Sequence, residues 1–126
     1  MADLTVQESP SRGRGVFAAR PFRQGETIEV CPVIALSVAD AVKLDDTHLY
    51  NYYFGWGPEG KAAAIALGFG SLYNHANDPN AVYLKDQASG TIVFSALRAI
   101  AAGEEIFVKY NYPATGQGGH LWFDIR

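Results

Sequence analysis

Residues 74–80 read Asn-His-Ala-Asn-Asp-Pro-Asn and directly follow the uncharged, mostly apolar stretch 62–73. Asparagine and aspartate hydrogen-bond to their own backbone in turns, and Pro79 fixes one backbone angle, so the segment by itself predicts a turn. A turn of this polarity beside the most apolar part of the chain also indicates half-buried polar groups that need partners. Two interpretations remain open at this point: a structural turn, and a segment that contacts a ligand.

The sequence on either side of this segment favours many short strands. The chain has 13 glycines, and their spacing is typical of strands joined by turns. Residues 81–85 and 91–96 flank a five-residue loop and predict a β-hairpin. Residues 26–30 and 105–110 predict two further strands.

The signal for helices is weak. Residues 37–44 could form a helix, since Ser37 is a suitable N-cap. One face of that helix would carry its apolar residues, Val38, Ala41 and Val42. Residues 48–54 and 62–67 could each form a helical turn or two. The sequence therefore predicts a mainly β fold with short helices.

Length and composition predict one globular domain. The chain has 126 residues, of which 48% are hydrophobic and 18% charged, so it is long enough to bury a core. The net charge of −3 argues against direct nucleic-acid binding through a phosphate-neutralising surface. A single cysteine, Cys31, excludes an intramolecular disulfide and a multi-cysteine zinc cluster. The three histidines lack metal-ligand spacing, so no bound metal is expected.

No segment has the character of a membrane span or a targeting signal. The longest uncharged stretch, 62–77, has 16 residues and is too short and too polar to cross a bilayer. The first residues lack the basic start and apolar run of a signal peptide. We therefore expect a soluble, intracellular protein without membrane contact.

Residues 55–61 fit the first seven positions of a phosphate-binding loop. The eighth position is Ala62, whereas Ser or Thr is needed there to hold magnesium. Pro58 also removes one backbone N–H from a loop that would work by presenting such groups. We interpret this segment as a glycine-rich surface turn.

Four segments, in order, resemble the SET domain family of protein lysine methyltransferases. Residues 11–18 are similar to the opening G-x-G-V-F segment of that family, and residues 22–26 match its following turn into a strand. Residues 74–80 resemble its N-H-S-x-x-P-N motif, and residues 100–110 resemble I-x-x-G-E-E-L/I-x-x-x-Y. The set extends over about residues 6–112, and the length implies a minimal single-domain member, like those of large DNA viruses and bacteria.

The resemblance implies the SET-domain β-clip, in which small, strongly curved sheets enclose a C-terminal pseudoknot. Residues 1–126 would form one domain with a core at about 6–112. Residues 113–126 contain a glycine-rich segment followed by large apolar residues that include Trp122. This arm is expected to dock on its own core, to close the active site, or to form a homodimer interface.

The resemblance also implies a reaction: methyl transfer from S-adenosylmethionine to the side-chain amine of a protein lysine, with S-adenosylhomocysteine as product and no metal. Tyr110 would be the catalytic residue, whose hydroxyl aligns the methyl group and the amine for in-line displacement. The residues that would hold the cofactor are Arg14, Gly15, Val16, Asn74, His75 and Trp122. The residues that would hold the substrate lysine are Tyr52, Val108 and Tyr112.

The substrate would be a histone or another basic protein with an exposed lysine. Free lysine has a pKa of about 10.4, so deprotonation near pH 7.4 costs roughly 4 kcal/mol. An aromatic channel with little water, beside the cofactor's sulfonium, would lower that pKa. The compartment would be the cytoplasm for a bacterial protein, and the nucleus for a protein that acts on chromatin.

Three residues depart from the family's pattern. Ala76 replaces the usual Ser or Cys of the Asn-His motif, and Lys109 stands where many members have Asp before the catalytic Tyr. Val108 replaces the frequent Phe or Tyr at a position that influences how many methyl groups fit. These departures leave an alternative open: a catalytically inactive β-clip module that binds S-adenosylmethionine or lysine-containing peptides.

Overall fold

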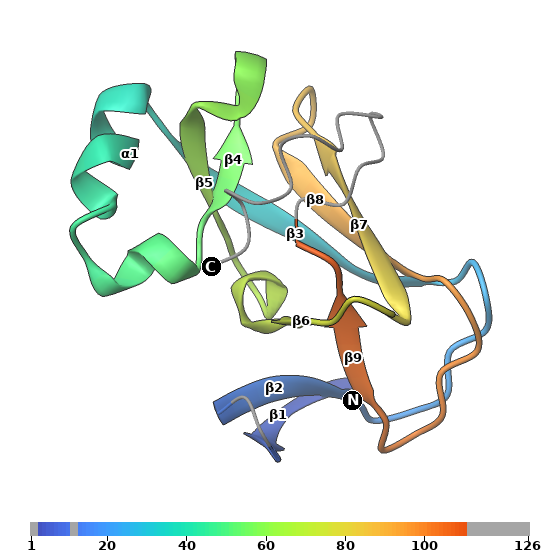
Figure 1. Ribbon diagram of the computed structural model, residues 1–126. Coiled ribbons are helices and arrows are strands. Elements are labelled where there is room, and N and C mark those ends of the chain that lie inside the picture. Colours follow the sequence, from blue (N-terminus) through green and yellow to red (C-terminus); the bar gives the residue numbers. More distant parts are fainter. Residues whose placement is uncertain (1–2, 11–12, 111–126) are drawn as a thin grey trace.

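Two small, curved β-sheets form the framework of the protein, with its α-helix to one side (Figure 1). The computed structural model describes residues 3–10 and 13–110. The elements within these ranges are β1 (Leu4–Ser9), β2 (Gly13–Ala18), β3 (Thr27–Leu36), α1 (Val38–Leu44), the 3-10 helix η1 (His48–Asn51), β4 (Phe54–Trp56), the 3-10 helix η2 (Pro58–Gly60), β5 (Ala62–Ala66), the 3-10 helix η3 (Gly70–Leu72), β6 (Asn74–His75), β7 (Ala81–Asp86), β8 (Thr91–Ala96) and β9 (Glu105–Val108). The prediction of a mainly β fold with short helices is confirmed.

The first sheet has the strand order β1-β2-β9-β6. β9 pairs antiparallel with β2, where Val16 lies opposite Ile106. On its other side β9 pairs parallel with β6, where His75 lies opposite Val108. The late strand β9 is therefore inserted between two segments from much earlier in the chain, as Figure 1 shows. This is the arrangement expected for the C-terminal pseudoknot of the β-clip.

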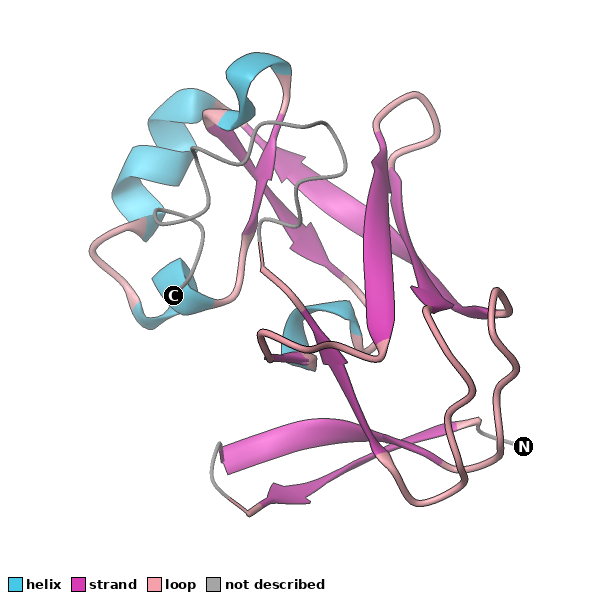
Figure 2. Cartoon of the chain, turned by 45° about the vertical axis from the view of Figure 1, so that its right-hand side comes forward, coloured by secondary structure: helices cyan, strands magenta, loops and turns pink. Residues whose placement is uncertain are grey.

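The second sheet has the order β4-β5-β3-β8-β7, and all its pairs are antiparallel (Figure 2). The predicted hairpin is confirmed as β7 and β8, in register from Ala81–Ala96 to Asp86–Thr91. Its loop is one residue shorter than expected because Asp86 still belongs to β7. The predicted strand 26–30 is confirmed from Thr27, where the longer, central β3 begins.

The prediction of helical turns at 62–67 is wrong, because Ala62–Ala66 forms strand β5. Alanine favours helices in isolation. Here β5 pairs with β3 on one side and β4 on the other, and Ala63 and Ala64 are fully buried. Sheet pairing and burial therefore override the local propensity. Residues 48–54 are helical only as far as η1, after which the chain enters β4.

The predicted helix at 37–44 is present as α1, with the Ser37 hydroxyl as its N-cap. That oxygen accepts a hydrogen bond of 3.1 Å from the backbone N–H of Asp40. The predicted apolar face is correct only at Ala41, since Val38 and Val42 are 50% and 62% exposed. α1 is short and packs against β5, with only its one small residue, Ala41, buried.

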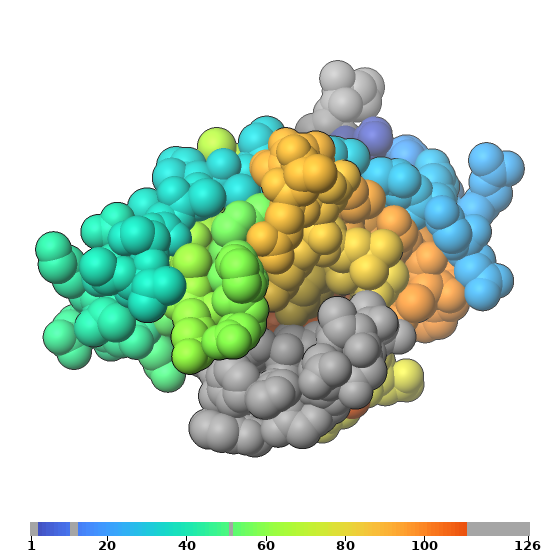
Figure 3. Space-filling model, turned by 90° about the horizontal axis from the view of Figure 1, so that it is seen from above, coloured from blue at the N-terminus to red at the C-terminus, as the bar shows by residue number. Residues whose placement is uncertain are grey.

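The glycine-rich segment 55–61 is a surface turn only from Gly57 onward, because Gly55 and Trp56 belong to β4 and Trp56 is buried in the core. Gly57 adopts a positive φ of 74°, and η2 after it is exposed. The Gly57 N–H donates to the side-chain oxygen of Gln87 at 3.2 Å. This bond joins the turn to the tip of the β7–β8 hairpin, and Figure 3 shows the two side by side.

Asn80, only 1% exposed, fastens the loop before β7 to β9. Its Oδ1 accepts the backbone N–H of Phe107 at 2.8 Å. Its Nδ2 donates to the backbone carbonyl of Glu105 at 2.9 Å. One buried amide thus satisfies two main-chain groups of the inserted strand. Among the described residues no helix is long and apolar enough to cross a membrane.

Substitution Asn80→Ala is expected to lower the free energy of unfolding by about 2–4 kcal/mol, because it leaves a buried N–H and a buried carbonyl without partners. The measurement is urea denaturation followed by circular dichroism. Asn77→Ala is the matched control: this asparagine is exposed in the same loop, and its loss should change stability by under about 0.5 kcal/mol. Equal effects of the two substitutions would contradict the role assigned to Asn80.

Candidate active site

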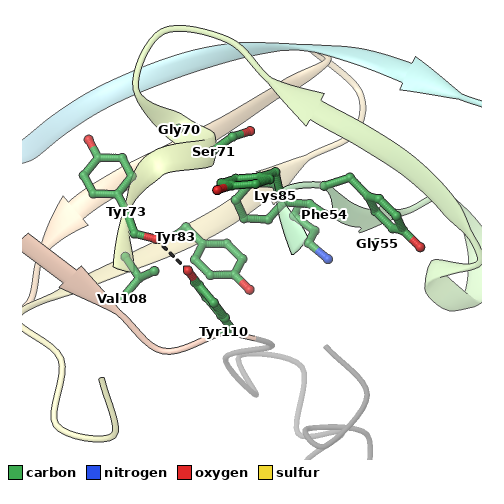
Figure 4. A pocket seen from close by; sticks show the side chains of 11 residues that line it. Phe54, Gly55, Gly70, Ser71, Tyr73, Tyr83, Lys85, Val108 and Tyr110 are labelled. Atoms are coloured by element: carbon green, nitrogen blue, oxygen red, sulfur yellow. Dashed lines mark hydrogen bonds between the residues drawn. The ribbon is translucent and has the colours of Figure 1, made fainter. Parts of the chain in front are cut away.

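A pocket that is partly open to solvent lies where the end of β9 meets the second sheet (Figure 4). Its lining residues are Tyr52, Tyr53, Phe54, Gly55, Gly70, Ser71, Tyr73, Tyr83, Lys85, Val108 and Tyr110. Six of these eleven residues are aromatic. Aromatic walls accommodate an aliphatic chain that ends in a cationic or amine head.

Both the side-chain hydroxyl and the backbone N–H of Tyr110 are hydrogen-bonded beside this cavity. Its hydroxyl donates a hydrogen bond of 2.8 Å to the backbone carbonyl of Tyr73, which Figure 4 draws as a dashed line. Its backbone N–H donates to Nδ1 of His75 at 2.9 Å. Because Nδ1 accepts, the proton of the neutral imidazole is on Nε2, 3.3 Å from the side-chain oxygen of Asn77. The orientation of Tyr110 is therefore determined by its neighbours.

Asn74, on β6, has a side-chain amide whose orientation is also determined. Its Nδ2 donates to the carbonyl of Arg14 and to the carboxylate of Glu105, both at 2.9 Å. The second Glu105 oxygen accepts the hydroxyl of Ser9 at 2.8 Å. A flipped amide would place its oxygen against two acceptors, so only this orientation is stable. Oδ1 of Asn74 therefore points away from these groups.

Gly15 allows this arrangement because it has no side chain. A Cβ at residue 15 would collide with the Glu105 carboxylate and lie 2.8 Å from Nδ2 of Asn74. β2 can therefore approach β6 and β9 closely only with glycine at this position. Val16 is fully buried in the core, so its backbone, not its side chain, is available to a ligand.

The outer edge of β6 offers further main-chain groups. Within the described residues β6 is the last strand of its sheet, with β9 on one side only. The N–H of Ala76 points to β9 and bonds the carbonyl of Val108 at 2.9 Å. Since main-chain groups alternate along a strand, the N–H and carbonyl of His75 point the opposite way. These groups suit the polar edge of a heterocycle.

The structure brings most of the predicted site residues together. Asn74 and His75 lie on β6, beside Arg14–Val16 of β2 and next to β9. Tyr52, Val108 and Tyr110 all line the cavity. Two predicted residues, Tyr112 and Trp122, lie outside the described residues.

The sequence analysis did not identify several residues of the site, among them two that orient its groups, Glu105 and Tyr73. Glu105 is a buried carboxylate at the start of an otherwise apolar strand, and a charge in such a pattern is a signal that could have identified it. Tyr73 contributes its backbone carbonyl to the cavity and its side chain to the core. A main-chain role of this kind leaves no side-chain pattern in the sequence.

Comparison with known proteins places this geometry in a family. The SET domain model matches residues 13–111. The chain is 35% identical over 122 residues to "Histone-lysine N-methyltransferase, H3 lysine-37 specific" of Schizosaccharomyces pombe, which covers 96% of this chain and 77% of that protein. The predicted resemblance is therefore confirmed.

Solved structures share the fold. A Plasmodium falciparum protein described as a candidate histone methyltransferase has a TM-score of 0.69 at 24% identity, over 89% of this chain and 96% of that one. A humanized mutant of the Chaetomium thermophilum Polycomb Repressive Complex 2, bound to the inhibitor GSK126, gives 0.69 at 23% identity, over 86% of this chain and 15% of that one. Together with the match over residues 13–111 and the fission yeast relative, the β-clip arrangement shows that this chain belongs to the SET domain family of protein lysine methyltransferases.

Proposed function

We propose that the protein transfers a methyl group from S-adenosylmethionine to a lysine of a basic protein, with Tyr110 as the catalytic residue. The observation that carries the proposal is the Tyr110 hydroxyl, bonded at 2.8 Å to the Tyr73 carbonyl beside a cavity with mostly aromatic walls. A hydroxyl held in one place by a main-chain acceptor can align two reacting atoms without reorganising during the reaction.

The residues around β6 fit the cofactor's polar groups. Asn74 directs Oδ1 away from its internal partners, so this oxygen would accept from the cofactor's ammonium. The main chain of His75, at the edge of β6 that pairs with no strand among the described residues, would bond the adenine. The backbone of Arg14–Val16 lies next to them and would complete the site. When bound, S-adenosylmethionine would supply an electrophilic methyl carbon on a sulfonium.

The cavity suits the substrate lysine. Tyr52 and Val108 would contact its aliphatic stem, and the aromatic rings would exclude water from the amine. Desolvation lowers the pKa of an amine, and so does a nearby like charge. The aromatic rings and the cofactor's sulfonium would favour the neutral amine, the form that can act as a nucleophile.

A histone is the substrate class best supported. The fission yeast relative, at 35% identity, is named as specific for lysine 37 of histone H3. The net charge of −3 also favours association with a basic protein over an acidic one. A protein with this substrate would act in the nucleus. The proposed roles of Trp122 and Tyr112, and the homodimer, stay predictions because those residues lie outside the described ranges.

Tyr110→Phe is expected to lower the rate of methyl transfer at least about 100-fold, because a misaligned reacting pair loses most of the advantage of intramolecular geometry. The measurement is incorporation of labelled methyl into histones, with circular dichroism to verify folding. Tyr50→Phe is the matched control: Tyr50 is partly buried on η1 and does not line the cavity. Transfer by folded Tyr110→Phe at the wild-type rate would refute the assignment.

Asn74→Ala is expected to weaken S-adenosylmethionine binding about tenfold or more, since a charge-assisted hydrogen bond to the ammonium is lost. Isothermal titration calorimetry measures this without any transfer. Asp78→Ala serves as control, as Asp78 is exposed in the loop that follows β6. Unchanged affinity in Asn74→Ala would exclude this residue from the cofactor site.

Val108→Phe is expected to restrict the product to monomethyllysine. Val108 is small and lines the cavity, so the wild-type protein should have room to add more than one methyl group. A phenylalanine would fill part of that space. Mass spectrometry of a histone peptide reports the number of methyl groups. A wild-type product that stops at one methyl group would contradict this assignment.

A further inference from the structure

The backbone carbonyl that accepts the Tyr110 hydroxyl belongs to Tyr73, whose side chain is fixed by contacts with the second sheet. The Tyr73 ring points away from Tyr110, while its carbonyl points toward it (Figure 4). The ring is 2% exposed and stacks on Phe94, with 4.3 Å between ring centroids. Its hydroxyl donates a hydrogen bond of 2.7 Å to Oε1 of Glu29 on β3. Tyr73 therefore connects the second sheet with the cavity.

Glu29 holds both ends of one short segment. Its Oε1 receives the Tyr73 hydroxyl, and its Oε2 receives the backbone N–H of Phe69 at 3.0 Å. Residues 69 and 73 flank η3, which leads from β5 into β6. A single carboxylate on the neighbouring sheet thus sets the position of the whole turn. Hydrogen bonds to a charged acceptor are stronger and more directional than neutral ones.

The turn lies directly on β3, so it has little freedom to move. A Cβ at Gly68 would collide with the Glu29 carboxylate, and one at Gly70 would lie 2.9 Å from the Cys31 sulfur. Glycine at both positions allows the backbone to approach β3. Burial raises the pKa of the Tyr73 hydroxyl, and the charge of Glu29 raises it further. The hydroxyl therefore remains a donor at any physiological pH.

We propose that Glu29 is a positioning residue for the Tyr110 hydroxyl and acts through Tyr73. Glu29 sets the path of the turn, the turn sets the direction of the Tyr73 carbonyl, and the carbonyl sets the place of the Tyr110 hydroxyl. Glu29 is not among the residues that line the cavity, so the proposed role is indirect. The catalytic consequence rests on the proposed function, whereas the effect on the Tyr110 hydroxyl does not.

The first test observes the Tyr110 hydroxyl without any reaction. The protein is labelled with carbon-13 at the tyrosine ζ carbon, whose NMR signal responds to hydrogen bonding of the hydroxyl. Loss of one signal in Tyr110→Phe assigns Tyr110. Tyr73→Phe and Glu29→Gln are expected to shift that signal. Tyr73→Phe keeps the ring and the stacking on Phe94, so it should fold even if Glu29→Gln does not.

The matched control is Glu26→Gln. Glu26 also accepts one side-chain and one backbone donor, from Arg20 at 2.8 Å and from the N–H of Arg23 at 2.9 Å. Glu26 does not line the cavity. The substitution Glu26→Gln should therefore leave the Tyr110 signal unchanged. A Tyr110 signal that stays unchanged in folded Tyr73→Phe, or that moves equally in Glu26→Gln, would overturn the proposal.

The second test is kinetic. Tyr73→Phe and Glu29→Gln are expected to lower kcat about tenfold through misplacement of the hydroxyl, with KM for both substrates within about twofold. Combined with Tyr110→Phe they should cause no further loss, because they act through the missing hydroxyl. Losses that multiply with that of Tyr110→Phe would overturn the proposal. If the wild-type protein transferred no methyl group, the proposed function would fail, and the NMR result would still decide the positioning role.

Discussion

The insertion of β9 between β2 and β6 is the constraint on which the rest of the structure depends. It places the end of a late strand next to Asn74 and His75, and it leads Tyr110 directly to the cavity. An inserted strand must satisfy its backbone on both sides in a buried position. The neighbouring strands satisfy most of it, and the Asn80 side chain completes the pairing at two main-chain groups.

Buried and half-buried polar side chains give this small fold its specific geometry. Glu105, Asn80 and Glu29 each bond two or more groups from distant parts of the chain. None of these three side chains has a buried cationic partner among the described residues. Their bonds are directional, so they select one arrangement of strands and turns where apolar packing alone would accept several. The candidate site lies next to the segments that these three residues hold in position.

The chain's local signals were reliable where the partner lies nearby in the sequence. The β7–β8 hairpin and the Ser37 cap of α1 follow from adjacent residues, and both are present. Local signals failed where a distant strand decides. The alanines of β5 become a strand because β3 and β4 pair with it, and no window of neighbouring residues contains that information.

The sequence by itself determined the family, the mainly β architecture, and Tyr110, Asn74 and His75 as residues of the candidate site, because ordered motifs carry these through residue identity. Only the tertiary structure revealed that the Tyr73 carbonyl accepts the Tyr110 hydroxyl and that Glu29 accepts the Tyr73 hydroxyl. The physical reason is that these contacts join main-chain atoms and side chains from separate strands. Their geometry exists only after the two sheets have come together, and no spacing along the chain encodes it.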